Sequence, residues 1–168
     1  MSGDAVVVTG PSGAGKTTLG RALAAATGAR FVDADAFHPP ANVAKMARGE
    51  GLDEADRAGW LDALVAHLEE AAGRGEAVVL ACSALRRAHR DRLREAGELR
   101  FLHLHVGEAE LARRLRSRRG HYAGASLLPS QLATLEAPGE DEGDVLVLDA
   151  EGSPEEVLAE ARRALARS

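Results

Sequence analysis

Gly10-Pro11-Ser12-Gly13-Ala14-Gly15-Lys16-Thr17 decides the fold of this chain, because it matches the phosphate-binding pattern Gly-x-x-x-x-Gly-Lys-[Ser/Thr] without a gap. The apolar residues 5–8 before it predict a buried strand, and residues 19–27 after it predict a helix that ends at Gly28. A strand before the loop and a helix after it are the setting in which this pattern binds nucleotides, rather than matching by chance. The sequence therefore predicts a nucleoside triphosphate site.

The residue types in the loop explain how phosphate would be bound. Glycines let the backbone turn so that its N–H groups, with the N-terminal end of the following helix, form a nest for phosphate oxygens. Lys16 can reach the β- and γ-phosphates, and the Thr17 hydroxyl can bind the Mg²⁺ that accompanies the nucleotide. The expected nucleotide-binding residues are Gly10, Pro11, Ser12, Gly13, Ala14, Gly15, Lys16 and Thr17.

Composition predicts one domain, residues 1–168, because the length suits a single α/β unit and 45% hydrophobic residues are enough for one core. No apolar run reaches the ~18 residues of a membrane span, and residues 6–8 lack the basic flank of a secretory signal. We therefore expect a cytoplasmic protein without a membrane partner. The single Cys82 agrees with a reducing compartment, and the net charge of −5 argues against nucleic acid.

Strand and helix patterns alternate along the whole chain. After the first strand, apolar runs predict strands at 29–32, 77–81, 100–106 and 144–149. Helical periodicity predicts a long helix over 58–72, whose Trp60 and neighbouring leucines we assign to the core. Ser153-Pro154-Glu155-Glu156 is a capping box that opens the final helix. This order predicts an α/β fold with a doubly wound five-stranded parallel sheet.

Asp33 and Asp35 follow the second predicted strand, at the sheet edge where α/β proteins place ligands. The two-residue period of a strand would put both carboxylates on one side of the chain. One could hold Mg²⁺ through water while the other accepts a proton from a substrate hydroxyl, as phosphoryl transfer requires. Ordinary turn aspartates are the alternative interpretation.

His38 and Lys45, which follow these aspartates in the chain, are weaker candidates for substrate binding. His38 lies between Phe37 and two prolines that favour an irregular loop, so we expect it to be exposed and able to bind a polyol or a carboxylate. It could instead cap local backbone. Lys45 is one of only two lysines among 21 basic residues, which suggests that a compact charge is needed there. A surface lysine is the alternative.

The second half of the chain adds three features. Ser83 and Arg86 follow the third strand and could reach a substrate, although Ser83 could simply be a helix N-cap. Residues 90–94 are predicted to be a mostly solvated arginine-rich helix face. The segment 113–131 joins an arginine-rich helix end to a glycine-containing stretch, as expected of a helical lid that closes over phosphates. A solvated basic face is the competing explanation.

A family resemblance covers nearly the whole chain. Beyond the phosphate loop, the segments that carry it are Asp33-Ala34-Asp35-Ala36-Phe37-His38-Pro39, Asn42-Val43-Ala44-Lys45-Met46, Trp60-Leu61, Ala81-Cys82-Ser83-Ala84-Leu85-Arg86, Arg118-Arg119-Gly120-His121-Tyr122 and Ser130-Gln131. This series resembles the small P-loop gluconokinases of bacteria. Arg86 departs from it, since lysine is usual there.

The resemblance implies a nucleoside-monophosphate-kinase-like P-loop kinase that uses ATP and Mg²⁺ to convert D-gluconate to 6-phospho-D-gluconate, usually as a homodimer. Asp35 would be the base on the attacking hydroxyl, Asp33 a water-mediated Mg²⁺ partner, and Arg118 a lid residue on adenine or phosphate. The residues it places at the sugar acid are His38, Lys45, Arg57, Arg86 and His121, with Ser83 and Gln131 nearby.

Four alternatives can be compared with these motifs. Shikimate kinases also carry Asp-x-Asp after the second strand, but Phe37-His38-Pro39 and the Cys82-Ser83-Ala84-Leu85 segment argue against one. We locate no base-recognition pocket for a nucleoside monophosphate kinase, and no Asn-Lys-x-Asp segment for a GTPase switch. Both aspartates and Lys16 are present, which argues against a catalytically silent nucleotide-binding module.

Overall fold

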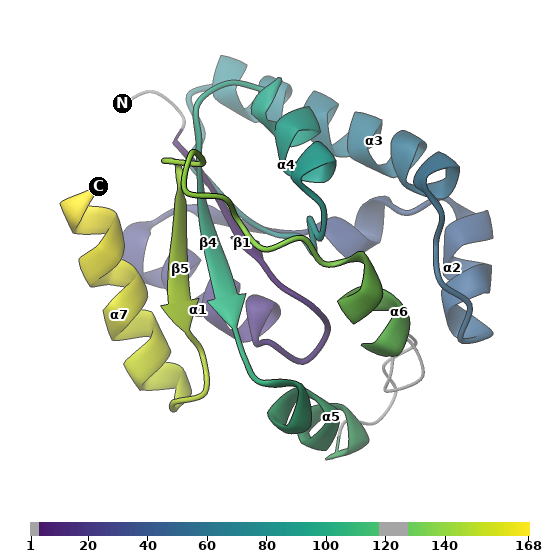
Figure 1. Cartoon of the computed structure of the whole chain (residues 1–168). Coiled ribbons are helices and arrows are strands. Elements are labelled where there is room, and N and C mark those ends of the chain that lie inside the picture. Colours follow the sequence, from purple (N-terminus) through teal and green to yellow (C-terminus); the bar gives the residue numbers. More distant parts are fainter. Residues whose placement is uncertain (1–3, 118–127) are drawn as a thin grey trace.

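The computed structural model describes residues 4–117 and 128–168. A sheet lies at its centre (Figure 1), and it has five strands. All the strand pairs are parallel, and the strand order is β2-β3-β1-β4-β5. The strands are β1 (Ala5–Thr9), β2 (Arg30–Asp33), β3 (Val78–Ala81), β4 (Leu99–His105) and β5 (Val145–Asp149). The predicted doubly wound parallel sheet is therefore confirmed.

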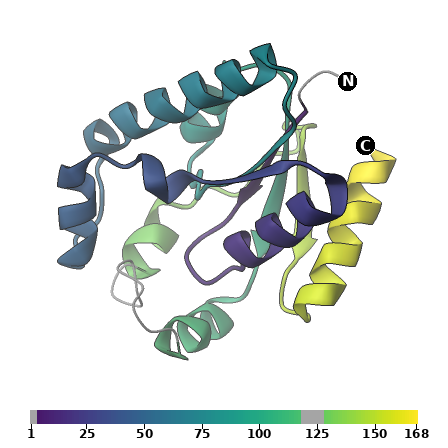
Figure 2. The same ribbon diagram turned by 180° about the vertical axis from the view of Figure 1, so that it is seen from behind.

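Helices cover both faces of the sheet, and the strand side chains alternate between them. Val6 and Val8 of β1 pack with α1 (Lys16–Thr27) and α7 (Pro154–Arg167), which lie side by side in Figure 2. Val7 points the other way, into a cluster with α3 (Glu54–Gly73) and Leu93 of α4 (Arg87–Arg94). Burial of both faces explains why β1 and β3 read as uninterrupted apolar runs.

The remaining helices gather at the carboxyl ends of the strands, where ligands are expected (Figure 1). They are the 3₁₀ turn η1 (Ala34–Phe37) and the α-helices α2 (Pro40–Ala47), α5 (Glu108–Ser117) and α6 (Leu128–Thr134). Among the described residues, none of the helices is both long and apolar enough to cross a bilayer.

The helix ends predicted at Gly28 and Ser153 are confirmed. Gly28 ends α1 in the left-handed conformation, at φ 76°, and Ser153 with Glu156 forms the predicted capping box of α7. Gly20 serves packing instead, because a Cβ built there would lie 2.6 Å from Cε1 of Phe31. This glycine lets α1 approach β2 closely.

The segment after β2 corrects the expectation of an irregular loop. Asp35 lies in η1, where its backbone N–H donates to Asp33 Oδ1 at 2.9 Å, so the strand period does not continue through both aspartates. Pro40 then opens α2 in its first turn. Proline fits there because the first helical N–H groups have no intrahelical acceptor and proline lacks an N–H.

Arg90 is the clearest departure from the predicted solvated face, since its side chain is only 1% exposed. It donates to both carboxylate oxygens of Glu142 at 2.8 Å, and to the carbonyl oxygens of Ala84 and Glu136. Ala84 has a positive φ of 40°, a conformation that a residue with a Cβ rarely adopts. Arg90 therefore anchors the strained β3–α4 connection to the segment that precedes β5.

Candidate functional site

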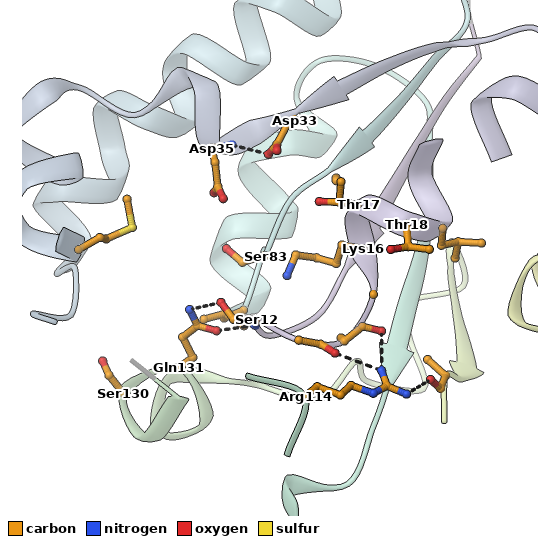
Figure 3. Close-up of a pocket in the computed structure, with 18 of the residues that line it drawn as sticks. Ser12, Lys16, Thr17, Thr18, Asp33, Asp35, Ser83, Arg114, Ser130 and Gln131 are labelled. Carbon is orange, nitrogen blue, oxygen red and sulfur yellow. Dashed lines mark hydrogen bonds between the residues drawn. The ribbon is translucent and has the colours of Figure 1, made fainter. Parts of the chain in front are cut away.

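A cavity of about 480 Å³ opens at the carboxyl ends of the strands. Figure 3 shows Lys16, Thr17, Asp33, Asp35 and Ser83 around one space inside it. Other lining residues used below are Ser12, His38, Arg57, Trp60, Arg114 and Gln131. The cavity thus joins the phosphate loop to most of the residues expected at a second substrate.

The phosphate loop has the backbone that its glycines predict. Gly10, Gly13 and Gly15 have φ values of 143°, 88° and 99°, all outside the range that residues with a Cβ adopt easily. Lys16 Nζ donates to Pro11 O at 3.0 Å, while Thr17 lies at the start of α1. The loop is therefore folded as a nest at a helix N-terminus, the arrangement that binds phosphate.

His38 lies beside Asp35 but is buried, which corrects the expectation that it is exposed. Its side chain is 4% exposed, and its ring stacks on Trp60 with centroids 4.4 Å apart. Burial, with the positive charge of Arg57, lowers the pKa of His38 to about 4. Its Nε2 lies 3.8 Å from Asp35 Oδ1. A neutral imidazole therefore borders the carboxylate.

Trp60 belongs to the core, as predicted, but it also lines the cavity. Its Nε1–H donates to Ala34 O at 2.8 Å, between the two aspartates in sequence, so the indole supports η1 as well as the His38 ring. Sequence reasoning missed this double role. The signal available was the single tryptophan of the chain, at the same helical spacing as the core leucines.

The basic residues predicted at the substrate separate into two groups. Arg57 is buried, lines the cavity and donates to Glu54 Oε1 at 3.0 Å. Arg86 and Lys45 are not among the lining residues. Arg86 Nε lies 3.2 Å from Glu54 Oε1, and Lys45 Nζ donates to Asp56 Oδ2 at 2.7 Å, which raises the pKa of the lysine. Both support the start of α3.

Ser83 lines the cavity directly after β3. The alternative interpretation, in which Ser83 caps the next helix, is wrong, because α4 begins at Arg87 and its N-cap is Arg86. The chain needs several residues, including the strained Ala84, to turn from β3 into α4. That detour leaves the Ser83 hydroxyl available to the cavity.

Two residues from the predicted lid segment contact the phosphate loop (Figure 3). Gln131 Oε1 accepts from Ser12 N at 2.7 Å, and Gln131 Nε2 donates to Ser12 Oγ at 2.9 Å. Arg114, which we did not single out from the sequence, donates to Gly13 O at 3.1 Å and to Ala150 O at 2.9 Å. Arg118 and His121 lie outside the described residues.

The oxygen donors of the cavity suit Mg²⁺ carried by a nucleotide. Thr17 offers a hydroxyl and Asp33 a carboxylate, the hard ligands that Mg²⁺ prefers. Among residues 4–117 and 128–168 there is no group of three His, Cys, Asp or Glu that could hold a metal without help. Mg²⁺ that arrives with a nucleotide needs only one or two protein oxygens, since phosphates and water supply its other ligands.

A phosphate loop in a parallel sheet, with carboxylates across the cavity, defines a P-loop kinase, and comparisons with known proteins specify the family. An AAA domain model matches residues 6–138. The gluconokinase of Gluconobacter oxydans is 48% identical over 94% of this chain and 89% of the relative. The thermoresistant gluconokinase of Escherichia coli is 38% identical over 91% of this chain and 88% of the relative. The chain belongs to the gluconokinase family and is an enzyme.

Solved structures agree with this assignment. A gluconokinase from Sinorhizobium meliloti superposes with a TM-score of 0.85 and 42% identity, covering 99% of this chain and 93% of the other. A sugar kinase from Janibacter sp. superposes with a TM-score of 0.92 and 44% identity, covering 98% of this chain and 95% of the other. A shikimate kinase from Aquifex aeolicus, with a TM-score of 0.65, 15% identity and 96% coverage of both chains, shares the fold alone.

Proposed function

We propose that this enzyme transfers the γ-phosphoryl group of ATP to the primary hydroxyl of D-gluconate, giving 6-phospho-D-gluconate and ADP. The observation that carries the proposal is one cavity lined by a phosphate nest with its lysine, a pair of carboxylates and the buried cation Arg57. These groups match the chemical needs of a nucleoside triphosphate and of a small, negatively charged acceptor. The gluconokinase names of the relatives supply the identity of the acceptor.

The proposed chemistry assigns one task to each group at the transferring phosphate. Loop N–H groups and Lys16 hold the β- and γ-phosphates, and Thr17 with Asp33, through water, would hold Mg²⁺, which neutralises phosphate charge. Asp35 accepts the proton of the primary hydroxyl as its oxygen attacks the γ-phosphorus. The bond between that phosphorus and the β–γ bridging oxygen breaks, and ADP carries the bridging oxygen away.

Recognition of the sugar acid is assigned to the other side of the cavity. Arg57 can pair with the carboxylate, for which a guanidinium offers two parallel N–H donors. His38, Ser83 and Gln131 line the same cavity and can bind hydroxyl groups. Lys45 and Arg86 would act through Asp56 and Glu54, which they hold. His121 and Arg118 keep the substrate and nucleotide roles that the family resemblance implies.

The wider setting is part of the same proposal. We expect residues 1–168 to act as one catalytic domain, in the cytoplasm and as a homodimer, with the lid segment 113–131 closing over the phosphates. Arg114 and Gln131 support the lid assignment, because they already connect α5 and α6 to the loop at Gly13 and Ser12.

The test is ADP release by the purified enzyme with ATP and Mg²⁺, comparing D-gluconate, shikimate, AMP and no acceptor. We expect turnover with gluconate, and we expect Asp35→Asn to lower kcat by ~10²-fold or more with little change in ATP affinity. Asp62→Asn is the matched control, because Asp62 lies on the surface of α3 and accepts from Arg92. Turnover with another acceptor only would refute the substrate assignment, and near-normal kcat in Asp35→Asn would remove Asp35 as the base.

A further inference from the structure

We propose that Asn42 is a positioning residue that fixes the tautomer of His38, so that an N–H group rather than a lone pair faces Asp35. Asn42 lies on α2 and is 3% exposed. Its amide nitrogen Nδ2 lies 2.8 Å from the backbone oxygen of Asp56 and 3.2 Å from Nδ1 of His38. The kinetic part of this inference rests on the proposed role of Asp35; the tautomer does not.

The orientation of the Asn42 amide follows from its partner on α3. A backbone carbonyl oxygen only accepts hydrogen bonds, so the side-chain atom that faces Asp56 O must be the NH₂ group. Exchanging the two ends of the amide would place oxygen against oxygen at 2.8 Å. The neighbouring carbonyl therefore decides an assignment that is otherwise ambiguous for an asparagine.

The same NH₂ group determines where the proton of His38 lies. An amide nitrogen donates and does not accept, so Nδ1 of His38, 3.2 Å away, must be the unprotonated acceptor. An imidazole with a bare Nδ1 is neutral and carries its proton on Nε2. Burial against Trp60 acts in the same direction, because it disfavours the charged imidazolium.

The Nε2 end of His38 faces the reacting side of the cavity. Asp35 Oδ1 is 3.8 Å away, too far for a direct hydrogen bond but close enough for the N–H to attract the carboxylate or donate to a substrate oxygen beside it. In the other tautomer a lone pair would face that carboxylate and repel it. Asn42 thus controls the sign of the interaction at Asp35 without lining the cavity itself.

The direct test is the protonation of His38 in the enzyme without substrate, read from ¹H–¹⁵N correlations of ¹⁵N-histidine-labelled protein. The signal among the 6 histidines is assigned by its loss in His38→Gln. We expect wild-type His38 to be protonated at Nε2 and bare at Nδ1. In Asn42→Asp an acceptor replaces the donor, and Nδ1 should acquire a proton. A wild-type proton on Nδ1, or no change in Asn42→Asp, would refute the proposal.

Kinetics provide the second measurement. A lone pair in place of the Nε2–H beside Asp35 would repel the carboxylate instead of attracting it, so Asn42→Asp should lower kcat about 10-fold or more, with KM for ATP little changed. Asn42→Leu, which loses the Asp56 contact but adds no acceptor, separates this from loss of packing and should retain more activity. Equal kcat losses in both variants would show a merely structural role. Absence of gluconate turnover in wild type would refute the proposed function and leave the tautomer result standing.

Discussion

Replacing Glu142 by glutamine should destabilise the protein strongly, because it leaves the Arg90 guanidinium buried without its carboxylate. Both side chains are 1% exposed, and two bonds of 2.8 Å join them. Removing one partner of such a pair costs about 3–5 kcal/mol, a large part of the roughly 5–15 kcal/mol by which domains are stable. The bonds from Arg90 to Ala84 O and Glu136 O remain, but neutral carbonyls do not replace the charge.

Urea unfolding followed by circular dichroism measures this cost. Glu142→Gln should lose about 3–5 kcal/mol and roughly 6–20 °C in Tm, at about 2–4 °C per kcal/mol for this chain length. Glu140→Gln is the control: Glu140 is exposed two positions away and should change stability by less than about 0.5 kcal/mol. A loss below about 1 kcal/mol in Glu142→Gln would refute the view that Arg90 depends on this carboxylate.

Lowering the pH should reduce the difference in the free energy of unfolding between wild type and Glu142→Gln. Arg90, and then Arg94, hold the pKa of Glu142 well below its ordinary value of 4.5. A carboxyl group with a lowered folded pKa contributes stability that is fully present above the unfolded pKa and is lost as pH falls toward the folded one. The two proteins should therefore converge as pH is lowered below 4.5. A gap that stays constant to pH 3 would contradict this account.

Three further predictions concern other parts of the molecule. Lys45→Ala should raise KM for gluconate more than KM for ATP, and equal effects in steady-state kinetics would show that Lys45 does not act on the acceptor side. Burial lowers the pKa of His103 to about 4. The free energy of unfolding of the wild type should therefore fall between pH 7 and pH 4.5, because the unfolded chain takes up the proton at His103 and the folded chain does not. In urea unfolding, His103→Gln should lose about 2 kcal/mol less than wild type over this pH range. Gly20→Ala should lower the free energy of unfolding by about 1–2 kcal/mol, because the new Cβ meets Phe31. Gly59→Ala has open space around the new Cβ and should raise the free energy of unfolding by up to about 1 kcal/mol. A change of the same sign in both variants would refute the packing argument.

The features that the sequence predicts well are those set by neighbouring residues. The strand–loop–helix unit around Lys16 follows from a contiguous motif, and the α7 capping box follows from Ser153 and the three residues after it. The doubly wound parallel sheet follows from general rules of connection, since strands that alternate with helices favour parallel pairing with right-handed crossovers. The strand order β2-β3-β1-β4-β5 comes from the structure alone. Asp33 and Asp35 follow β2 at the same sheet edge as the phosphate loop after β1, and they line one cavity with it.

The features that the sequence does not predict depend on partners far along the chain. Arg90 reads as a surface arginine because nothing near it indicates that Glu142 will enclose it. His38 reads as exposed because its burial requires Trp60 from another helix. Asn42 lies between Ala41 and Val43, where nothing nearby in the sequence indicates a partner, and only the position of the Asp56 carbonyl gives it a role.

The strand order has a consequence for synthesis on the ribosome. Strand β1 is the middle strand, and its Ala5 pairs with Val78 on one side and Leu99 on the other. Strand β1 thus leaves the exit tunnel before either of its neighbours, and at about 5–20 residues per second it waits several seconds for both of them. During that interval the phosphate loop lacks the complete sheet that anchors it. Nascent chains that end before β4 should therefore be sensitive to proteases and unable to retain a nucleotide.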